Sequence, residues 1–460
     1  MLVAGVDSST QSTKVVLCRA DDGAVVGIGS APHPDGTECD PQAWWEALQK
    51  AGDGLLGQAA AVGVAAQQHG MIVLDAAGAV LRPALLWNDM RSAGQAVDLI
   101  AELGGPAQWA ASTGSVPTAS FTVTKLRWLA EREPASAART SLVMLPHDWL
   151  TWRLGQAQGA GPVTDRGDAS GTGYFSPAAG TWLPDIAAAA LGHGVDLPRV
   201  AGPADATGET SWGAALSAGT GDNMGAALGL GLGEGDVVIS IGTSGTAYAV
   251  TPAGASDASG AVAGFADATG RFLPLVATVN AARVLTLTAG LLGVDTVALS
   301  QLALAAGPGA GGLTLLPYLD GERTPNRPDA TGVLSGLTTA NGTRQNLARA
   351  AVEAVLCSLA DAMDHLAAAT GLTPRRVLLI GGAARSEAVR AIAPGIFGTE
   401  VAVPEPAEYV AIGAARQAAW ALAGGGAPPP WPAPEAAVYR GGPAWPVREK
   451  YAALRAAQAP

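Results

Sequence analysis

The chain has 460 residues, too many for one ordinary hydrophobic core, so we expect two large domains or three small ones. Hydrophobic residues make up 48% of the chain and charged residues 14%, which is typical of a compact globular protein and argues against disorder. The net charge of -12 argues against nucleic acid as a partner, because no basic stripe is available for a phosphate backbone.

The N-terminal segment and the cysteines indicate the compartment. The segment reaches Asp7 after six residues and has neither the charged region nor the cleavage site of a secretion signal. No uninterrupted apolar run approaches the length of a membrane span. Cys18, Cys39 and Cys357 are odd in number and lack metal-ligand spacing, which fits thiols in a reducing compartment. We therefore expect a soluble, cytoplasmic protein without a membrane partner.

The first predicted elements form a β-hairpin with a hydroxyl-rich turn. Residues 2–6 are apolar, residues 7–13 (DSSTQST) form the turn, and residues 14–18 are rich in β-branched side chains. Residues 25–29 are predicted to form a third strand.

Helix and strand signals alternate after this hairpin. Asp40 is a typical N-cap and Pro41 suits the first helical position, so residues 41–51 are predicted to form a helix. A strand is predicted next, at residues 61–66. This alternation indicates an α/β protein.

The hairpin pattern returns near residue 236. An apolar strand at residues 237–241 leads into a Gly/Ser/Thr turn at 242–246 and then into another strand. Two such copies in one chain indicate a duplicated domain with a cleft between the copies. We place the boundary near residues 231–235 and assign the domains to residues 1–233 and 234–460.

The C-terminal part continues the α/β pattern. Thr343 is a candidate N-cap for a long helix that ends at Gly371, and a strand follows at residues 376–380. The segment at 424–434 is rich in Gly and Pro and is interpreted as a loop or tail rather than a domain linker. A last helix is predicted from residue 447 onward.

Both turns have the composition of phosphate-binding turns. They offer backbone N–H groups and hydroxyls to phosphate oxygens, and a carboxylate at the rim, Asp7, can hold Mg²⁺ through water. The alternatives are a polar hairpin in which Asp7 bonds its own turn, and a plain loop at 242–246. The segment at 377–387 places glycines between a strand and a helix, where backbone approaches a nucleotide closely or simply turns. The pairing of the two turns favours phosphate binding.

Asp222 is the candidate general base. It stands at the head of a run of small residues at 219–233, and it could be an ordinary N-cap or a base that takes the proton from an attacking hydroxyl. Phosphoryl transfer depends chiefly on positioning and charge stabilisation, so one carboxylate base, Mg²⁺ and backbone donors suffice.

Residues 65–92 collect amide, imidazole, indole and charged side chains around a hairpin. This mixture suits a polyhydroxylated ligand, because each hydroxyl needs a donor or acceptor and the C–H face stacks on an aromatic ring. A core histidine and a buried tryptophan are the alternative interpretation. The side chains are Gln67, Gln68, His69, Trp87, Asn88, Asp89 and Arg91.

These segments resemble the carbohydrate kinases of the FGGY type, from about residue 2 to about residue 422. The resemblance implies two ribonuclease-H-like domains of the actin-type ATPase fold, with sugar deep in an interdomain cleft and MgATP at its mouth. The matching segments, in chain order, are GVDSSTQSTK, QQHG, LRPALLWNDMRS, LPHDWLTWRL, TDRGDASGT, GTGDN, ISIGTSGT, LPYLDGERTPNR, LIGGAARSE and AIGAARQAAW.

The resemblance also implies roles by position. Asp222 matches the catalytic base, and Asp7 matches the carboxylate beside Mg²⁺ and phosphate. The implied sugar-binding residues are Gln68, His69, Asp222 and Asn223. The implied ATP-binding residues are Thr10 and Lys14 in the first hairpin, Gly242, Thr243 and Ser244 in the second, and Gly382 and Ala383 in an adenosine loop.

Three positions depart from the family pattern. Gln68 stands where methionine is common, which changes one face of the sugar pocket. Ser9 and Ala383 each replace a glycine in the phosphate and adenosine motifs. Both replacements are small, so we expect looser nucleotide binding rather than its loss.

The implied activity is ATP- and Mg²⁺-dependent phosphorylation of a pentulose hydroxyl, with D-xylulose as the expected sugar and a homodimer as the candidate assembly. Ribulose, gluconate and rare sugars or polyols are alternatives within the family, whereas a glycerol kinase would show an Arg-Glu pair near Gln68 and His69. An actin-like or chaperone-like ATPase is the alternative from another class, and the dependence of ATP turnover on added sugar separates it.

Overall fold

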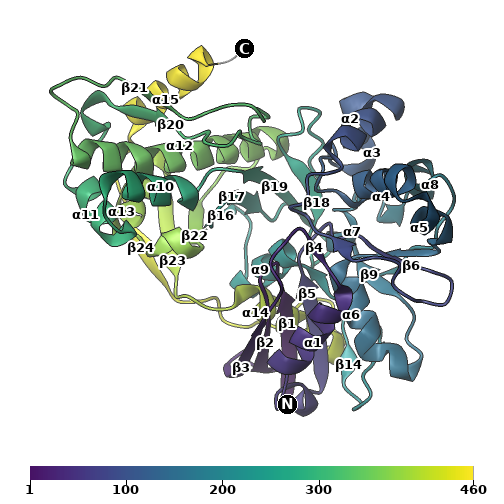
Figure 1. The fold of residues 1–460 in the computed structure, drawn as a ribbon. Coiled ribbons are helices and arrows are strands. Elements are labelled where there is room, and N and C mark those ends of the chain that lie inside the picture. The colour runs from purple at the N-terminus through teal and green to yellow at the C-terminus, as the bar shows by residue number, and fades with distance from the viewer. Residues whose placement is uncertain (459–460) are drawn as a thin grey trace. The chain divides into compact units, whose positions relative to one another are not determined.

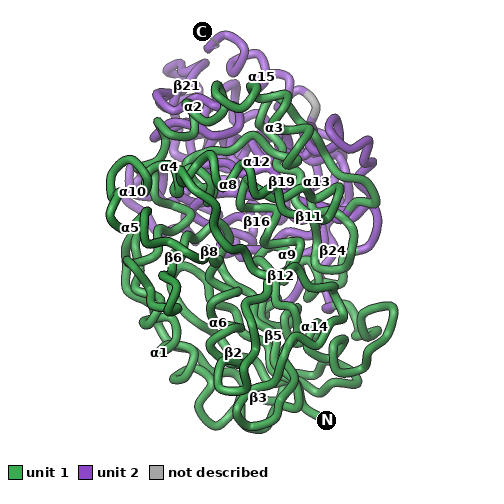
Figure 2. Tube along the Cα trace, turned by 90° about the vertical axis from the view of Figure 1, so that its right-hand side faces the viewer, with its two compact units in different colours: residues 1–232, 251–273, 407–433 green, residues 233–250, 274–406, 434–460 purple. Residues whose placement is uncertain are grey.

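The computed structural model describes residues 1–458, which form a mixed α/β protein (Figure 1). The chain divides into two compact units, coloured separately in Figure 2. Unit 1 consists of residues 1–232, 251–273 and 407–433, and unit 2 consists of residues 233–250, 274–406 and the chain from Pro434 on.

The two units do not correspond to two continuous halves of the chain. The division into residues 1–233 and 234–460 stays a prediction about domains in chain order, while in space residues 407–433 belong to unit 1. The segment at 424–434 is a loop, as predicted, because it contains no helix or strand, but the prediction that it is not a domain linker was wrong. It carries the chain out of unit 1, because the residues after it add a strand and a helix to unit 2.

The sheet of unit 1 has the strand order β13-β14-β5-β1-β2-β3, with β15 also paired to β5. Its outer strands are β13 (Gly208–Glu209), β14 (Ala215–Leu216), β3 (Val25–Pro32) and β15 (Thr220–Gly221). β1 (Leu2–Ser8) runs antiparallel to β2 (Ser12–Arg19) and parallel to β5 (Ala61–Ala66). Residues 7, 8, 12 and 13 belong to these strands, so the turn is shorter than predicted. The ladder continues to its last pair, Ser8 and Thr13, where the Thr13 hydroxyl also donates to Ser8 Oγ at 3.4 Å.

One face of this sheet packs on α1 (Pro41–Ala51) and α6 (Pro146–Gly155) through large side chains such as Trp44 and Trp149. Fully burying a large apolar side chain contributes about 1.5–3 kcal/mol, so these contacts hold the layer together. The predicted helix at residues 41–51 is confirmed. The Asp40 carboxylate accepts from the Gln42 N–H at 2.9 Å.

The other face packs on α14 (Tyr409–Ala423) through small residues. A Cβ added to Gly5 would lie 1.9 Å from the carbonyl oxygen of Ala411, so the helix backbone rests directly on β1. α9 (Asp222–Leu230) crosses α14 equally closely, since a Cβ added to Gly413 would lie 1.8 Å from the carbonyl oxygen of Gly225. This contact fixes α9 on the sheet.

The other strands and α-helices of unit 1 are not part of this sheet. They are β4 (Glu38–Cys39), β6 (Ile72–Leu74), β7 (Ala84–Leu85), α2 (Ala93–Glu102), α3 (Gly105–Thr113), α4 (Thr122–Arg132), α5 (Pro134–Arg139), β8 (Leu142–Met144), β9 (Val163–Asp165), α7 (Arg166–Ala169), β10 (Phe175–Ser176), β11 (Thr181–Trp182), α8 (Pro184–Leu191), β12 (Arg199–Ala201) and β18 (Ala263–Ala266).

Unit 2 repeats the central arrangement of unit 1. β16 (Asp236–Ile241) runs antiparallel to β17 (Gly245–Ala249) and parallel to β22 (Arg376–Ile380), as β1 does with β2 and β5. The duplicated hairpin predicted from the sequence is therefore a structural repeat. The strand order in this unit is β19-β17-β16-β22-β23-β24, with β19 (Phe272–Thr278), β23 (Glu400–Pro404) and β24 (Ala436–Tyr439).

The long helix of unit 2 is α12 (Arg344–Thr370). The Thr343 hydroxyl accepts from the Asn346 N–H at 3.2 Å, and Gly371 ends the helix with a φ of 70°, so both predicted caps are confirmed. The other elements are α10 (Ala282–Leu292), α11 (Thr296–Leu304), β20 (Thr314–Leu316), β21 (Val333–Ser335), α13 (Glu387–Phe397) and α15 (Trp445–Ala457). Among residues 1–458 only α10 and α11, bent by 89°, pass a length and hydropathy test for a membrane span, and they pass it only as a pair.

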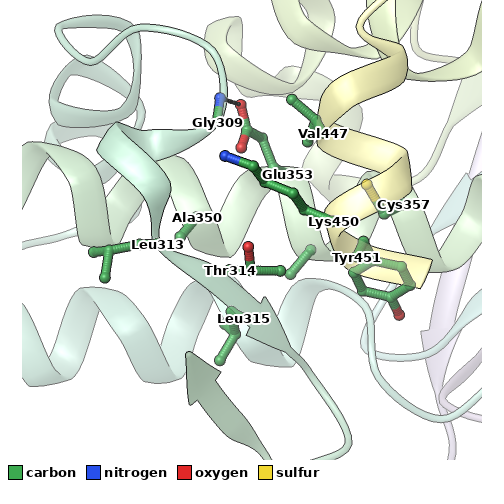
Figure 3. Close-up of a pocket in the computed structure, with 11 residues that line it drawn as sticks. Gly309, Leu313, Thr314, Leu315, Ala350, Glu353, Cys357, Val447, Lys450 and Tyr451 are labelled. Atoms are coloured by element: carbon green, nitrogen blue, oxygen red, sulfur yellow. Dashed lines mark hydrogen bonds between the residues drawn. The ribbon is translucent and has the colours of Figure 1, made fainter. Parts of the chain in front are cut away.

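The C-terminal helix α15 packs on α12 around a small pocket (Figure 3). Glu353 accepts a hydrogen bond from the Gly309 N–H at 2.9 Å there, and Lys450 and Tyr451 line it from α15. Its volume is about 10 Å³, which suits one water molecule and excludes a sugar or nucleotide. We interpret this pocket as a packing feature that seats α15.

Candidate active site

Asp7 lies at the carboxyl end of β1 and is only 5% exposed. Burial raises its pKa to about 7, with the nearby charge of Asp222 acting in the same direction and Lys14 opposing it. Its Oδ1 atom has no hydrogen-bond partner among residues 1–458. A buried oxygen left without a donor is costly, and a cation would satisfy it, so the residue fits the predicted Mg²⁺ ligand.

Asp222 is the first residue of α9, and Gly221 is the N-cap. The N-cap alternative for Asp222 is therefore wrong. Its carboxylate turns instead to Asn223 and accepts from the backbone N–H and from Nδ2, both at 2.7 Å. Burial raises the pKa of Asp222 to about 6, while the bonds from Asn223 lower it. Such a carboxylate is ionised at pH 7 and basic enough to assist a hydroxyl.

Buried contacts hold the segment just before Asp222. The Thr220 hydroxyl donates to Asp165 Oδ2 at 2.9 Å, and Gln417 Nε2 donates to the Gly219 carbonyl at 3.0 Å. Gly219 has a φ of 76°, and a Cβ there would lie 2.4 Å from the His147 ring, so only glycine fits. Asp222 thus follows directly after a short strand, β15, whose neighbours restrict its movement.

A fully buried cluster of charged groups lies behind this strand. His147 Nδ1 lies 2.6 Å from Asp168 Oδ2, and its Nε2 lies 3.3 Å from Asp148 Oδ1. Burial opposes the charge on His147, but Asp148 and Asp168 raise its pKa to about 9. These three side chains also have the spacing of a metal site. Because both ring nitrogens face carboxylates, we interpret the cluster as an ion-pair network that packs against Gly219, three residues before Asp222.

Amide groups gather beside Asp222. Asn223 Nδ2 donates to Gln68 Oε1 at 3.2 Å, which joins three of the predicted sugar-binding residues in one group. Gln68 Nε2 and both amide atoms of Gln67 are buried without a partner among residues 1–458. Unsatisfied buried amides fit a polyhydroxylated ligand that would complete their hydrogen bonds.

His69 adopts a φ of 68°, which is uncommon for a residue with a side chain. Its Nδ1 lies 2.6 Å from the Gly171 carbonyl, and its ring lies 4.8 Å from that of Phe121. Lys125 Nζ donates to the His69 carbonyl at 2.9 Å and so clamps this backbone. His69 therefore has core contacts, as the alternative interpretation expected, and it lies next in sequence to the amide group.

The other polar side chains at residues 65–92 form hydrogen bonds within the protein. Trp87 Nε1 donates to the Thr10 hydroxyl at 2.8 Å, which ties the first turn to this segment. Arg91 Nε donates to Asp89 Oδ1 at 2.8 Å, so these two residues form an ion pair. Asn88 Nδ2 is 3.5 Å from the Gly36 carbonyl.

A large pocket of about 600 Å³ lies in unit 2, between the second turn and helices α10, α11 and α13. Its size and mixed lining suit a nucleotide. Gly381 precedes it with a φ of 90°, and a Cβ there would lie 2.7 Å from the Ile241 carbonyl, so the βα turn requires glycine. The lining residues are Ile241, Gly242, Thr243, Ala282, Leu285, Thr286, Thr296, Val297, Leu299, Ser300, Gln301, Val352, Gly382, Ala383, Arg385, Ser386 and Glu387.

Comparison with known proteins identifies the family. The N-terminal domain of the FGGY family of carbohydrate kinases matches residues 2–231, and the C-terminal domain of that family matches residues 237–422. The chain belongs to the FGGY family of carbohydrate kinases. The resemblance stated from the sequence is therefore confirmed, together with the two-domain, actin-type fold.

Relatives and solved structures cover nearly all of this kinase. It is 47% identical over 439 residues to the xylulose kinase of Streptomyces coelicolor, across 92% of this chain and 88% of that protein. It is also 47% identical over 443 residues to the xylulose kinase of Streptomyces rubiginosus, with the same shares covered. The crystal structure of xylulose kinase from Bifidobacterium adolescentis superposes with a TM-score of 0.92 at 45% identity and covers 99% of each chain.

Most of the predicted site residues of the kinase lie close to other residues predicted for the same ligand. In unit 2, Gly242, Thr243, Gly382 and Ala383 line one pocket, while Ser244 is not part of its lining. In unit 1, Lys14 binds a residue that the sequence did not indicate. Its ammonium lies 2.6 Å from Glu408 Oε2.

Sequence reasoning missed the residues that support the site of the kinase. The segments containing His147 and Asp165 were quoted only as family matches, although acidic residues within apolar stretches are a signal of a buried network. Thr220, Lys125 and Glu408 gave no signal, because their contacts are with residues far away in the chain.

Proposed function

We propose that this kinase transfers the γ-phosphoryl group of ATP to a hydroxyl of D-xylulose and forms D-xylulose 5-phosphate. The similarity to xylulose kinases over nearly the whole chain carries this proposal. The unsatisfied amides of Gln67 and Gln68 beside Asp222 support a ligand with several hydroxyls. We assign sugar binding to the N-terminal domain, residues 1–233, and nucleotide binding to the C-terminal domain, residues 234–460.

In the proposed mechanism Asp222 accepts the proton of the attacking sugar hydroxyl. Its carboxylate is ionised at neutral pH, and Asn223 holds it in place with two hydrogen bonds. Gln68 and His69 orient the sugar. Mg²⁺, when bound, neutralises charge on the phosphates, and Asp7 would hold it.

The ATP is proposed to bind in the pocket of about 600 Å³, with its adenosine against Gly382 and Ala383. The turn at Gly242 and Thr243 offers backbone N–H groups to the phosphates, and in the first hairpin Thr10 and the ammonium of Lys14 are proposed to contact them as well. Phosphoryl transfer needs little covalent chemistry from the protein, so the main task of these turns is to position the phosphates.

A coupled assay of ADP release over a panel of sugars tests the substrate. We expect D-xylulose to give the highest kcat/KM when compared with L-ribulose, gluconate, glycerol and rare pentuloses. A tenfold higher value for any of these corresponds to about 1.4 kcal/mol of transition-state preference and would overturn the assignment.

A further inference from the structure

Lys14 and Asp7 are direct neighbours across the first hairpin, yet the lysine bonds elsewhere. The two residues are paired in the antiparallel ladder of β1 and β2, so their side chains leave the same face of the sheet. Cβ atoms in such pairs are about 4.5–5.5 Å apart, and a lysine stem easily spans that gap. The ammonium instead lies 2.6 Å from Glu408 Oε2, and Asp7 Oδ1 keeps no partner among residues 1–458.

The position of Glu408 is set by helix α14. It immediately precedes this helix, and its carbonyl accepts from the Ile412 N–H at 2.8 Å. α14 rests directly on β1 at Gly5, two residues before Asp7 on the same face. The seating of the helix therefore brings Glu408 to Lys14, although 394 residues separate them in the chain.

This arrangement decides which cation Asp7 can receive. An ammonium bonded to Asp7 would occupy the oxygen that a divalent cation needs, because both seek the same lone pairs. Glu408 offers Lys14 a carboxylate that is one third exposed, where the pair remains partly hydrated. Asp7, by contrast, is buried, and its Oδ1 atom has no hydrogen-bond partner among residues 1–458.

We propose that Glu408 is a positioning residue that holds the Lys14 ammonium away from Asp7, so that Asp7 remains available for the divalent cation. This inference rests on the proposed role of Asp7 as the carboxylate that holds Mg²⁺. It predicts that the loss of Glu408 weakens divalent-cation binding because the Lys14 ammonium then bonds Asp7.

Binding of Mn²⁺ in the presence of ADP, followed by electron paramagnetic resonance, tests this without any turnover. In Glu408→Gln the ammonium should move onto Asp7 and weaken Mn²⁺ binding by about 10- to 100-fold, the usual effect of losing a group that supports a metal ligand. Unchanged Mn²⁺ binding in a folded Glu408→Gln would overturn the proposal.

The double variant Lys14→Met with Glu408→Gln is the decisive comparison. It removes both the displaced cation and its partner, so Mn²⁺ binding should return to within about threefold of the parent, a small part of the loss expected for a support group. Its kcat should stay low, because the phosphate loses its lysine. Mn²⁺ binding that remains as weak as in Glu408→Gln would mean that Glu408 serves the metal or the fold directly, and the proposal would be wrong.

Matched variants separate the effect of Glu408 from that of losing any surface carboxylate. Glu102→Gln breaks an exposed ion pair with Arg127 in the same unit and should leave Mn²⁺ binding unchanged. Asp7→Asn should weaken it. If Asp7→Asn binds Mn²⁺ normally, the metal role of Asp7 fails and the inference falls with it. The choice of sugar does not enter this assay. If Glu408→Gln does not fold, Glu408→Asp, with its shorter stem, should give a smaller loss that the same lysine change reverses.

Discussion

Asp7 and Asp222 have raised pKa values, to about 7 and about 6, chiefly because burial disfavours their charged forms. The two carboxylates differ in the number of hydrogen-bond donors around them. Asp222 has two donors from Asn223, which keep it ionised at neutral pH. Asp7 Oδ1 has none among residues 1–458, so its charge depends on a cation. Two buried carboxylates in one unit are thus suited to a proton acceptor and a metal ligand.

The variant Asp222→Asn should lower kcat by at least about 100-fold, the lower end of what a general base contributes. Asparagine keeps the shape and one acceptor oxygen, so the melting temperature should change little. ADP binding, followed by calorimetry, should persist because the pocket of unit 2 does not include this residue. Near-normal turnover in the folded variant would contradict the assignment of Asp222 as base.

The pH dependence of kcat should have an acidic limb set by Asp222. The base works only when ionised, so kcat should fall about tenfold for each pH unit below its pKa, which is about 6. Asn223→Ala keeps the bond from the backbone N–H and removes the bond from Nδ2, one of the two that lower this pKa, so the limb should move to higher pH. Profiles measured between pH 4.5 and 8 on both proteins (roughly the range in which a carboxylate of this kind titrates) decide the point. An unmoved limb would show that another group titrates.

At the scale of elements, small residues decide how the helices are placed. α9 carries Asp222 at its start, and α14 carries Glu408 just before its start. These helices touch backbone to backbone through Gly225 and Gly413. Both therefore sit close enough to the sheet for their leading carboxylates to reach the end of β1.

The variant Gly413→Ala should destabilise the fold by about 3 kcal/mol, the upper part of the range for overpacking. The new Cβ would lie 1.8 Å from the Gly225 carbonyl, and a backbone oxygen cannot move aside cheaply. Gly94→Ala is the control. A methyl group added to this helical glycine in α2 would meet no atom within 4 Å, so alanine there should be neutral or stabilise by up to about 1 kcal/mol. Equal effects of the two changes in urea unfolding would contradict the packing argument.

At the scale of the whole molecule, the duplicated units have diverged in chemistry. The hairpin of unit 1 carries Asp7, whereas the hairpin of unit 2 carries glycines and hydroxyls and no carboxylate in its turn. Asp222, the proposed proton acceptor, and the amide group lie in unit 1, and the large pocket lies in unit 2. This separation suits a reaction in which two different substrates are held by two copies of one scaffold.

ATP turnover should depend on the sugar, unlike that of an actin-like or chaperone-like ATPase. Without D-xylulose we expect release of ADP to fall by about 100-fold or more, because water is not positioned as the sugar hydroxyl is. L-Ribulose and glycerol at the same concentration provide the comparison. A rate that is independent of any added sugar would contradict the assignment of a sugar acceptor.

The sequence by itself determined much of the local structure and the family. Asp40 and Pro41 indicated the start of α1, and Thr343 and Gly371 bounded α12, because caps depend on residues a few positions apart. The repeated hairpin indicated duplication for the same reason. Asp7 stood out because it joins an apolar run to a hydroxyl-rich turn, and Asp222 stood out because it heads a run of small residues.

Only the tertiary structure decided which of these residues meet. Asp222 proved to be the first residue of α9 rather than its N-cap, with its carboxylate bonded to Asn223, and Lys14 proved to bind Glu408, which lies 394 residues away in the chain. Residues 407–433 joined unit 1 because their small side chains fit against β1 and α9. Such contacts depend on how distant segments pack, and the free energy of that packing is not expressed in any short stretch of sequence.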